Sequence, residues 1–156
     1  MSRHYGRAIG GERSVDKVPL NTPANTTIPS SIRLNGETAY TTYSGGTTRE
    51  KFLDYLKNVL IPTLHEGDVV VMDNMRTHHV KEVQMLLQEA NIKLLYLPAY
   101  SPDLNPIENM WSKIKAILRK LKIRSLSLLP QGIAEAFSLI HPSDCVGWFS
   151  AAGISC

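Results

Sequence analysis

The chain has 156 residues, of which 43% are hydrophobic and 20% are charged, a length and balance typical of one globular domain with one core. No apolar run approaches the roughly 20 residues that cross a bilayer, and with only Cys145 and Cys156 a disulfide framework is not expected, so we expect a cytoplasmic protein with no membrane partner. The net charge of +3 is too small to identify a partner by itself.

An irregular segment and a hairpin open the chain. Residues 1–24 contain glycine and proline without helical or alternating periodicity, and we interpret them as an extended connection. Residues 25–34 and 37–44 are rich in β-branched and aromatic side chains. They flank Asn35-Gly36, a dipeptide of tight hairpin turns because both positions tolerate positive φ. Pro29 weakens the first strand, since it cannot donate a ladder hydrogen bond.

Helix and strand patterns then alternate. Apolar residues recur at helical spacing between Thr48 and Pro62, which predicts a helix packed on the sheet. Residues 69–72 are an uninterrupted apolar run of the kind found in strands covered on both faces. A helical pattern over residues 80–90 and a second apolar run over residues 94–97 follow. The order strand, helix, strand predicts parallel pairing.

Pro106 begins the next expected helix, after an irregular stretch over residues 98–105. Residues 125–156 are predicted to form one or two further helices. We therefore divide the chain into a core over residues 1–124 and a C-terminal helical extension of the same domain over residues 125–156. The apolar stripe that we expect to face the core from the helix at Pro106 consists of Ile107, Trp111, Ile114, Leu118 and Leu121.

Asp73 is the first candidate for chemistry. An acidic residue directly after a buried parallel strand lies at the carboxyl edge of the sheet, where open α/β folds place their ligands. The alternative is that Asp73 only starts the turn into the next helix, as Asp often does. His78 and His79 follow where that helix begins, and we interpret them as residues of the helix start rather than metal ligands.

Glu108 is the second candidate. If Asn105 is the N-cap and Pro106 the first helical residue, Glu108 is third, where a Glu can reach back to the N-cap amide and complement the helix dipole. Capping alone could therefore explain it. On a helical wheel, however, Glu108 lies at the head of a row of basic residues on the same side of the helix, offset from the apolar stripe.

These basic residues belong to a longer stretch with no acidic residue between Glu108 and Glu135, which ends at Arg124. Charge of a single sign favours phosphate contacts, because a solvated helix face usually mixes signs to gain i,i+4 pairs. A surface that only maintains solubility is the alternative. The residues that we expect to contact DNA, named the basic ridge below, are Lys113, Lys115, Arg119, Lys120 and Lys122.

Two segments together resemble the catalytic core of mariner-related bacterial insertion-sequence transposases, a branch of the DDE superfamily. They are Val-Val-Val-Met-Asp-Asn-Met-Arg-Thr-His at 69–78 and Leu-Pro-Ala-Tyr-Ser-Pro-Asp-Leu-Asn-Pro-Ile-Glu-Asn-Met-Trp at 97–111. The 34 residues between Asp73 and Glu108 match the spacing of this branch. Residues 5–13 also resemble the segment after the family's first strand.

The resemblance implies an α/β fold of the RNase H-like type, a mixed sheet flanked by helices. It implies that Asp73 is the second catalytic Asp and Glu108 the catalytic Glu. With a third carboxylate they would hold two Mg²⁺ or Mn²⁺ ions, which prefer hard oxygen ligands. The implied activity is metal-dependent phosphodiester cleavage and strand transfer of an insertion sequence. The implied partners are transposon ends and target DNA, with homo-oligomers forming on DNA and the protein associated with the nucleoid.

The family's first Asp has no counterpart, because only residues 1–4 precede the segment that resembles the family. Asp16 follows that segment in the irregular connection, and Asp54 lies in a predicted helix. We therefore expect a sheet without its first, central strand and a chain that is inactive alone. The alternative function is a non-catalytic remnant, or the C-terminal half of a split-frame transposase that needs a separate N-terminal polypeptide.

Overall fold

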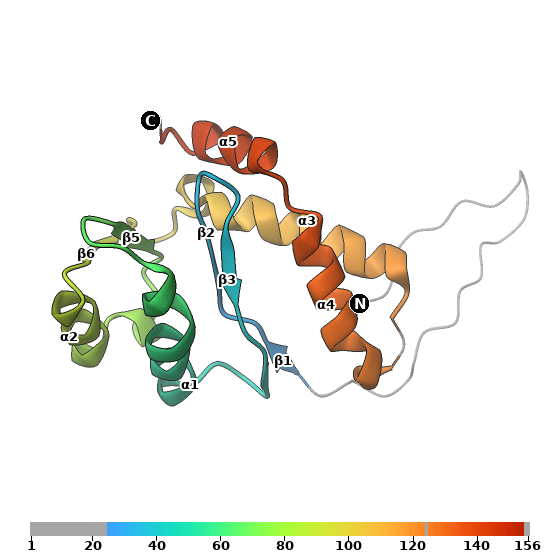
Figure 1. The fold of residues 1–156 in the computed structure, drawn as a ribbon, viewed down its shortest axis with the longest axis horizontal. Coiled ribbons are helices and arrows are strands. Elements are labelled where there is room, and N and C mark those ends of the chain that lie inside the picture. The colour runs from blue at the N-terminus through green and yellow to red at the C-terminus, as the bar shows by residue number, and fades with distance from the viewer. Residues whose placement is uncertain (1–24, 124, 155–156) are drawn as a thin grey trace, which may run out of the picture.

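The computed structural model of the chain describes residues 25–123 and 125–154. The expectations for residues 1–24, including the family-like residues 5–13 and Asp16, lie outside the described residues, as does Arg124. Within the described ranges, five α-helices accompany three separate two-stranded ladders (Figure 1). No helix in these ranges is both long enough and apolar enough to cross a membrane.

The expected hairpin is present. Strand β2 (Ser30–Ile32) pairs antiparallel with β3 (Thr38–Tyr40). The Arg33 amide donates to the Glu37 carbonyl at 2.8 Å, and the Gly36 amide donates to the Arg33 carbonyl at 3.1 Å. The loop therefore uses positive φ at Gly36 (+93°) but not at Asn35, unlike the tight turn expected from the dipeptide. This geometry is that of a longer hairpin loop with a left-handed glycine.

Pro29 interrupts the strand, as its missing N–H predicts. Before it, β1 (Thr26–Thr27) pairs antiparallel with β4 (Tyr43–Ser44), and after it the ladder resumes as β2 and β3. The Pro29 carbonyl accepts from the Thr41 amide at 3.3 Å, which keeps the two halves of the hairpin together across the break.

Helix α1 (Arg49–Tyr55) begins at Thr48, whose hydroxyl accepts from the Lys51 amide at 3.3 Å. It continues as a π-helical turn, η1 (Leu56–Leu60), and a 3₁₀ turn, η2 (Ile61–Thr63). Pro62 lies near the start of this 3₁₀ turn, a position that tolerates a missing N–H. The helix therefore extends just beyond the proline that was expected to limit it.

The parallel unit is confirmed. Strand β5 (Val69–Met72), helix α2 (Lys81–Glu89) and strand β6 (Lys93–Tyr96) follow in order, with Val69 opposite Lys93 and Met72 opposite Tyr96. The expectation that β5 is covered on both faces is wrong for the described residues, because Val69 and Val71 are 48% and 44% exposed. Only the face that carries Val70 and Met72 packs into a core.

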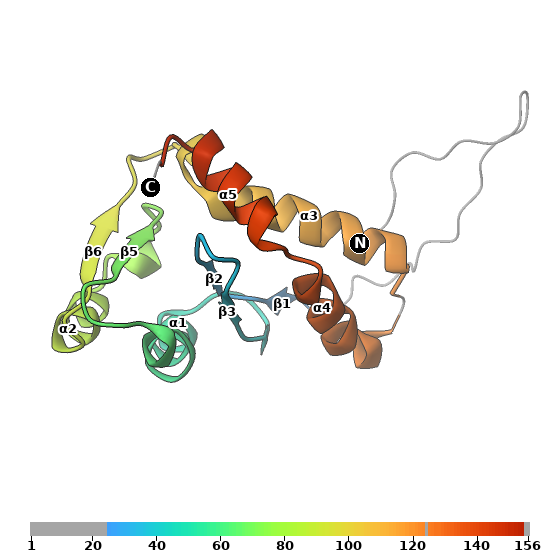
Figure 2. The ribbon, with the colours of Figure 1, turned by 45° about the horizontal axis from the view of Figure 1, so that its top comes forward.

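The C-terminal half is helical, and Figures 1 and 2 both show α5 (Pro142–Ala151) alongside the long helix α3 (Pro106–Leu121). Helix α4 (Leu129–Ser138) also packs against α3. Leu121, expected in the core, is 38% exposed, because α3 ends there and Lys122 adopts a left-handed conformation. The short 3₁₀ turns are η3 (Arg76–His78), η4 (Pro102–Leu104) and η5 (Leu126–Leu128).

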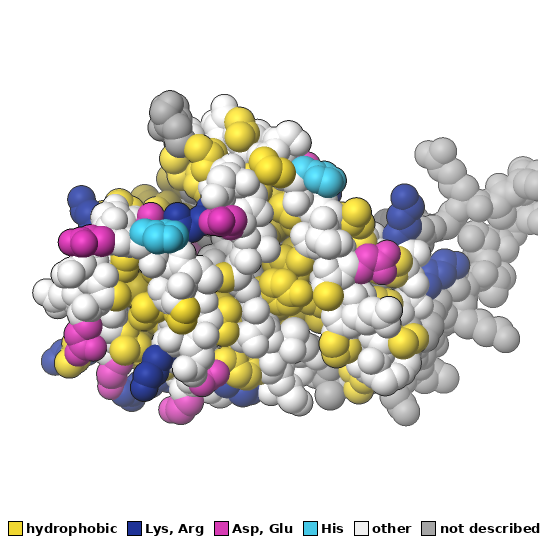
Figure 3. Space-filling model, in the orientation of Figure 1, with side chains coloured by type: hydrophobic (Ala, Val, Ile, Leu, Met, Phe, Trp, Pro, Cys, Tyr) yellow, Lys and Arg dark blue, Asp and Glu magenta, His cyan; other side chains and the backbone are white. Residues whose placement is uncertain are grey.

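The buried side chains form two cores. The first core joins α1, η1, α2, β5 and β6, and the second joins α3, α4 and α5 with the β2–β3 hairpin packed against it. Tyr40 of the hairpin stacks on Phe137 of α4, with ring centroids 3.8 Å apart. Figure 3 shows apolar side chains filling the region between the hairpin and α4 on this face. The hairpin therefore belongs to the second core.

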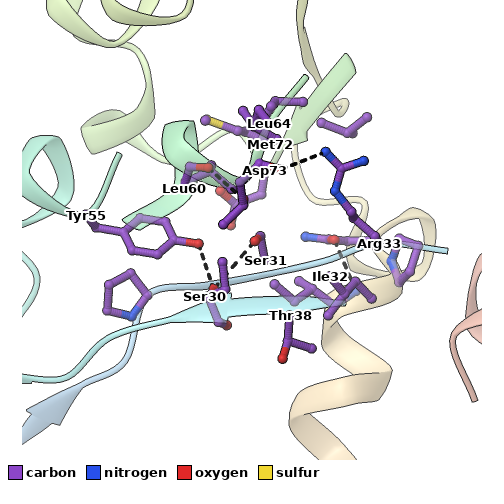
Figure 4. Close-up of a pocket in the computed structure, with 18 of the residues that line it drawn as sticks. Ser30, Ser31, Ile32, Arg33, Thr38, Tyr55, Leu60, Leu64, Met72 and Asp73 are labelled. Atoms are coloured by element: carbon purple, nitrogen blue, oxygen red, sulfur yellow. Dashed lines mark hydrogen bonds between the residues drawn. The ribbon is translucent and has the colours of Figure 1, made fainter. Parts of the chain in front are cut away.

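A cleft of about 860 Å³ separates β2 from β5, and we call it the central cleft. In Figure 4, Ser30 and Ser31 lie on one side of it, and Met72 and Asp73 lie on the other. The Tyr55 hydroxyl bridges the two cores by donating to the Ala39 carbonyl at 3.0 Å. The position of β2 beside β5, with no described strand between them, is the main feature that distinguishes this arrangement from one continuous sheet.

Arg33 crosses the central cleft at the end where β5 begins. Its guanidinium pairs with Asp68, immediately before β5, and donates to the Thr63 carbonyl at 3.2 Å. The hydrogen bond from Arg33 lowers the pKa of the Asp68 carboxyl, with a further contribution from the His65 amide. Because Arg33 follows the last residue of β2 while Asp68 precedes the first residue of β5, the two strands run in opposite directions along the cleft.

Gly36 provides a test of how the hairpin is held. A Cβ at this position would lie 3.0 Å from the Pro142 ring and backbone, and the positive φ disfavours any side chain. We expect Gly36→Ala to lower the free energy of unfolding by at least about 1–2 kcal/mol. Gly46→Ala is the matched control, because a Cβ there meets nothing within 4 Å. Equal denaturant midpoints for the two variants would contradict the described loop.

Candidate functional site

Asp73 lies directly after β5, at the carboxyl end of the parallel ladder, as expected. Its side chain is 39% exposed, but one of its oxygens, Oδ1, is buried and has no hydrogen-bond partner among the described residues. A buried carboxylate oxygen without a donor is costly unless a cation or another donor approaches it. The group that approaches Asp73 Oδ1 in this structure is the imidazole of His78.

His78 lies against this carboxylate. Its Nδ1 is 2.5 Å from Asp73 Oδ1, without the alignment of a hydrogen bond, and 3.2 Å from the Asp73 carbonyl oxygen. The imidazole stacks on Phe52 of α1, with ring centroids 4.4 Å apart, and the Tyr96 hydroxyl donates to the His78 carbonyl at 2.6 Å. These contacts fix the turn that carries Asp73, so His78 does more than start a helix, the role expected from its sequence position.

Glu108 is the third residue of α3, as expected, and its side chain is exposed. Asn105 caps the helix, with its side chain accepting from the Ile107 amide at 3.4 Å. The Asn105 amide donates to the Pro102 carbonyl at 3.0 Å, and no hydrogen bond joins it to the Glu108 carboxylate among the described residues. The reciprocal capping interaction that could have explained Glu108 is therefore not formed.

Both carboxylates line one small cavity of about 350 Å³, which we call the carboxylate pocket. Its wall is the loop from Leu97 to Pro102 together with Asn74, Met75 and Asn105. Asp73 and Glu108 also line the central cleft, so the two cavities meet at these residues. Carboxylate and amide oxygens are the ligands that Mg²⁺ and Mn²⁺ prefer. In the described part of the chain, no three acidic, histidine or cysteine side chains form a cluster able to hold a metal ion.

The basic ridge divides into two kinds of residue. Lys115, Arg119, Lys120 and Lys122 are exposed on α3 or at its end. Lys113 is half-buried, and its Nζ lies 2.5 Å from Asp144 Oδ2 of α5.

The Lys113 hydrogen bond holds the pKa of Asp144 below its usual range, helped by the His141 amide, which donates to the same oxygen at 2.9 Å. Lys113 therefore joins α3 to α5 and is less available to a partner than the other ridge residues.

The family model of DDE superfamily endonucleases matches residues 1–129. The chain belongs to this family. The match covers most of the chain and includes both carboxylates of the pocket, so the family resemblance carried by residues 69–78 and 97–111 is confirmed.

Two curated relatives of this DDE family member come from Caenorhabditis briggsae. The chain is 32% identical to the transposable element Tcb2 transposase over 73 residues, which are 44% of this chain and 27% of the relative. It is 32% identical to the Tcb1 transposase over 82 residues, which are 50% of this chain and 30% of the relative. The matches therefore span less than a third of either relative's length.

The fold is similar to that of solved mariner transposase domains. The crystal structure of the Mos1 mariner transposase catalytic domain matches with a TM-score of 0.61 and 17% identity, over 80% of this chain and 74% of that one. The same domain solved with raltegravir and Mg matches with a TM-score of 0.60 and 16% identity, over 80% and 75%. At these identities the likeness shows the fold alone: a mixed α/β, RNase H-like arrangement.

Proposed function

We propose that this chain forms the catalytic domain of a DNA transposase, performing metal-dependent phosphodiester cleavage and strand transfer of an insertion sequence. The observation that carries the proposal is the carboxylate pocket, which Asp73 and Glu108 line from separate elements of a chain that belongs to the DDE family. The named relatives are transposases, which act on DNA. DNA, comprising transposon ends and target, is therefore the proposed partner, with copies of the protein assembling on it.

Asp73 and Glu108 fit a divalent cation. The Asp73 side chain is 39% exposed, the Glu108 side chain is exposed, and both line the carboxylate pocket. Two Mg²⁺ or Mn²⁺ ions, with a third carboxylate, would activate the attacking oxygen and stabilise the leaving oxygen of the phosphodiester. The chain's own residues orient these groups, since His78, held by Phe52 and Tyr96, fixes the turn that carries Asp73.

The basic ridge supplies the proposed DNA contacts. It continues along α3 from the turn after Glu108, so a DNA backbone held at the carboxylate pocket would run past Lys115 and Arg119. Lys120 and Lys122 extend the exposed positive charge to the end of the helix. Lys113 contributes least in this proposal, because its ammonium group already pairs with Asp144.

A second candidate function rests on the central cleft. We propose that an extended strand from a separate N-terminal polypeptide fills it, so that this chain is the C-terminal half of a split transposase, or its remnant. Val69 and Val71 are exposed on β5, and the Ser30 hydroxyl on β2 is buried without a hydrogen-bond partner among the described residues. Each strand also has one edge that no described strand pairs, which is where another strand can add.

We propose one orientation for this strand, the one that brings its carboxyl end to the candidate site. Since β2 and β5 run in opposite directions, a strand parallel to β5 would be antiparallel to β2 and would form a mixed sheet. Its carboxyl end would then lie beside Asp73, where a third acidic residue would complete the cation site.

We also propose that residues 125–156 extend the same domain as residues 1–124, because α4 and α5 share the second core with α3.

The proposed cation ligands are tested by DNA cleavage. With the N-terminal polypeptide supplied, the chain is expected to cleave DNA only when Mg²⁺ or Mn²⁺ is present. Asp73→Asn and Glu108→Gln should reduce the rate by more than the about 10- to 100-fold that loss of an outer-shell partner costs, because each removes a ligand itself. The measurement is plasmid nicking under single-turnover conditions.

Asp103→Asn is the matched control for both carboxylates, because Asp103 is an exposed acid in the loop that leads to α3 but does not line the carboxylate pocket. It should cleave within about twofold of the parent, as expected of a surface substitution away from the site. Undiminished cleavage by either Asp73→Asn or Glu108→Gln would remove that residue from the site.

The basic ridge is tested by salt dependence. Lys115→Ala and Arg119→Ala each remove one cation from the proposed DNA path, so each should reduce the slope of log affinity against log salt by about one unit or slightly less. Lys113→Ala should leave the slope nearly unchanged and instead lower the melting temperature, because it leaves Asp144 without its partner. If the salt slope fell in Lys113→Ala but not in Lys115→Ala, the proposal that Lys115 rather than Lys113 contacts DNA would be contradicted.

The central cleft is tested with peptides of about six residues, the usual strand length. A peptide of alternating Val and Thr that ends in Asp should bind the chain and raise its melting temperature, since a bound strand stabilises the folded state by mass action. The same peptide with a central Pro is the control, because Pro removes a ladder donor. Equal effects of the two peptides, or none, would contradict the proposal.

A further inference from the structure

Tyr100 occupies an unusual position in the loop between β6 and α3. Its φ is +57°, a conformation that a bulky side chain with a Cβ rarely adopts. Its side chain is also fully exposed, at 103% of the reference value, the highest among the exposed large hydrophobic residues. The loop thus combines an unfavourable backbone conformation with an unburied aromatic ring, and neither feature adds to the stability of the described fold.

Tyr100 belongs to the residues that line the carboxylate pocket. Tyr100 lines this cavity together with Asp73 and Glu108. Met75, in the loop that follows β5, also lines it, and the Met75 side chain is 48% exposed. Pro98 and Pro102 bracket the loop and restrict its backbone, so the position of Tyr100 is set locally rather than by burial. Two exposed apolar side chains, Tyr100 and Met75, therefore belong to residues that line the same pocket as the two carboxylates.

We propose that Tyr100 is a stacking platform for one unpaired nucleobase, next to the phosphodiester held at Asp73 and Glu108. The inference rests on the proposed function and adds to it a specific base contact. A single exposed aromatic ring suits one base, since every base has a π-face and stacking requires no larger surface. A stable protein partner would need a contiguous interface of roughly 800 Å² per side, far more than one exposed ring provides.

The surrounding charges agree with this placement. Lys115 lies two turns after Glu108 on the same helix, so phosphates would follow α3 while the adjacent base lies over the loop that precedes the helix. Tyr100 combines full exposure of its side chain with a positive φ. Unfavourable backbone conformations of this kind persist where a binding site requires them.

The test uses single-stranded DNA and duplex DNA with a one-nucleotide gap, each carrying 2-aminopurine at the unpaired position, with continuous duplex as the reference. Tyr100→Phe should bind all three within about twofold of the parent, because it keeps the ring. Tyr100→Leu should bind the single-stranded and gapped DNA about tenfold more weakly, as expected for loss of one stacked base. It should also lose the quenching of 2-aminopurine, while its affinity for continuous duplex stays within about twofold.

Two further variants separate stacking from folding. Tyr100→Gly removes the ring and also the strain of a positive φ, so it should melt no lower than the parent while binding the gapped DNA as weakly as Tyr100→Leu. Met85→Ala removes an exposed apolar side chain from α2, which does not line the pocket, and should bind all DNAs like the parent.

Equal gapped-DNA affinity and equal quenching in the parent and Tyr100→Leu would overturn the stacking role alone. Failure of the parent chain to bind any of the DNAs would overturn the proposed function, and the stacking role with it.

Discussion

The parallel pairing of β5 with β6 is the constraint on which the candidate site depends. Both strands end at the same edge, and the Leu97 amide extends the ladder by donating to the Met72 carbonyl at 2.8 Å. Asp73 follows β5 at this edge, and the loop that leads to Glu108 follows β6 at the same edge. Two carboxylates with 34 residues between them in the chain therefore line one cavity.

The division into two cores explains the other half of the architecture. The β2–β3 hairpin is bound to the second core by the Tyr40–Phe137 stack, whereas β5 belongs to the first core. The Arg33–Asp68 pair and the Tyr55 hydrogen bond connect the cores across the central cleft. Tyr43 of β4 adds to these links, because it packs against the first core and its hydroxyl donates to Asp54 of α1.

Local signals in the sequence predicted the elements well. Thr48, Asn105 and Pro106 mark helix starts where they were expected, and the order of apolar runs predicted parallel β5 and β6. The exposure of Val69 and Val71 could not be predicted, because an apolar run does not reveal whether another layer covers it. Two contacts depend on tertiary structure and could not be predicted from the sequence: His78 beside Asp73, and Lys113 paired with Asp144.

The most direct test is whether Asp73 and Glu108 bind one cation site together. Sub-stoichiometric Mn²⁺ added to the ¹⁵N-labelled chain broadens amide signals near the bound ion. We expect broadening at residues 73–75 and 107–109 at the same Mn²⁺ concentration, and its loss from both segments in Asp73→Asn. Broadening confined to one segment, or unchanged in Asp73→Asn, would contradict a site shared by the two carboxylates.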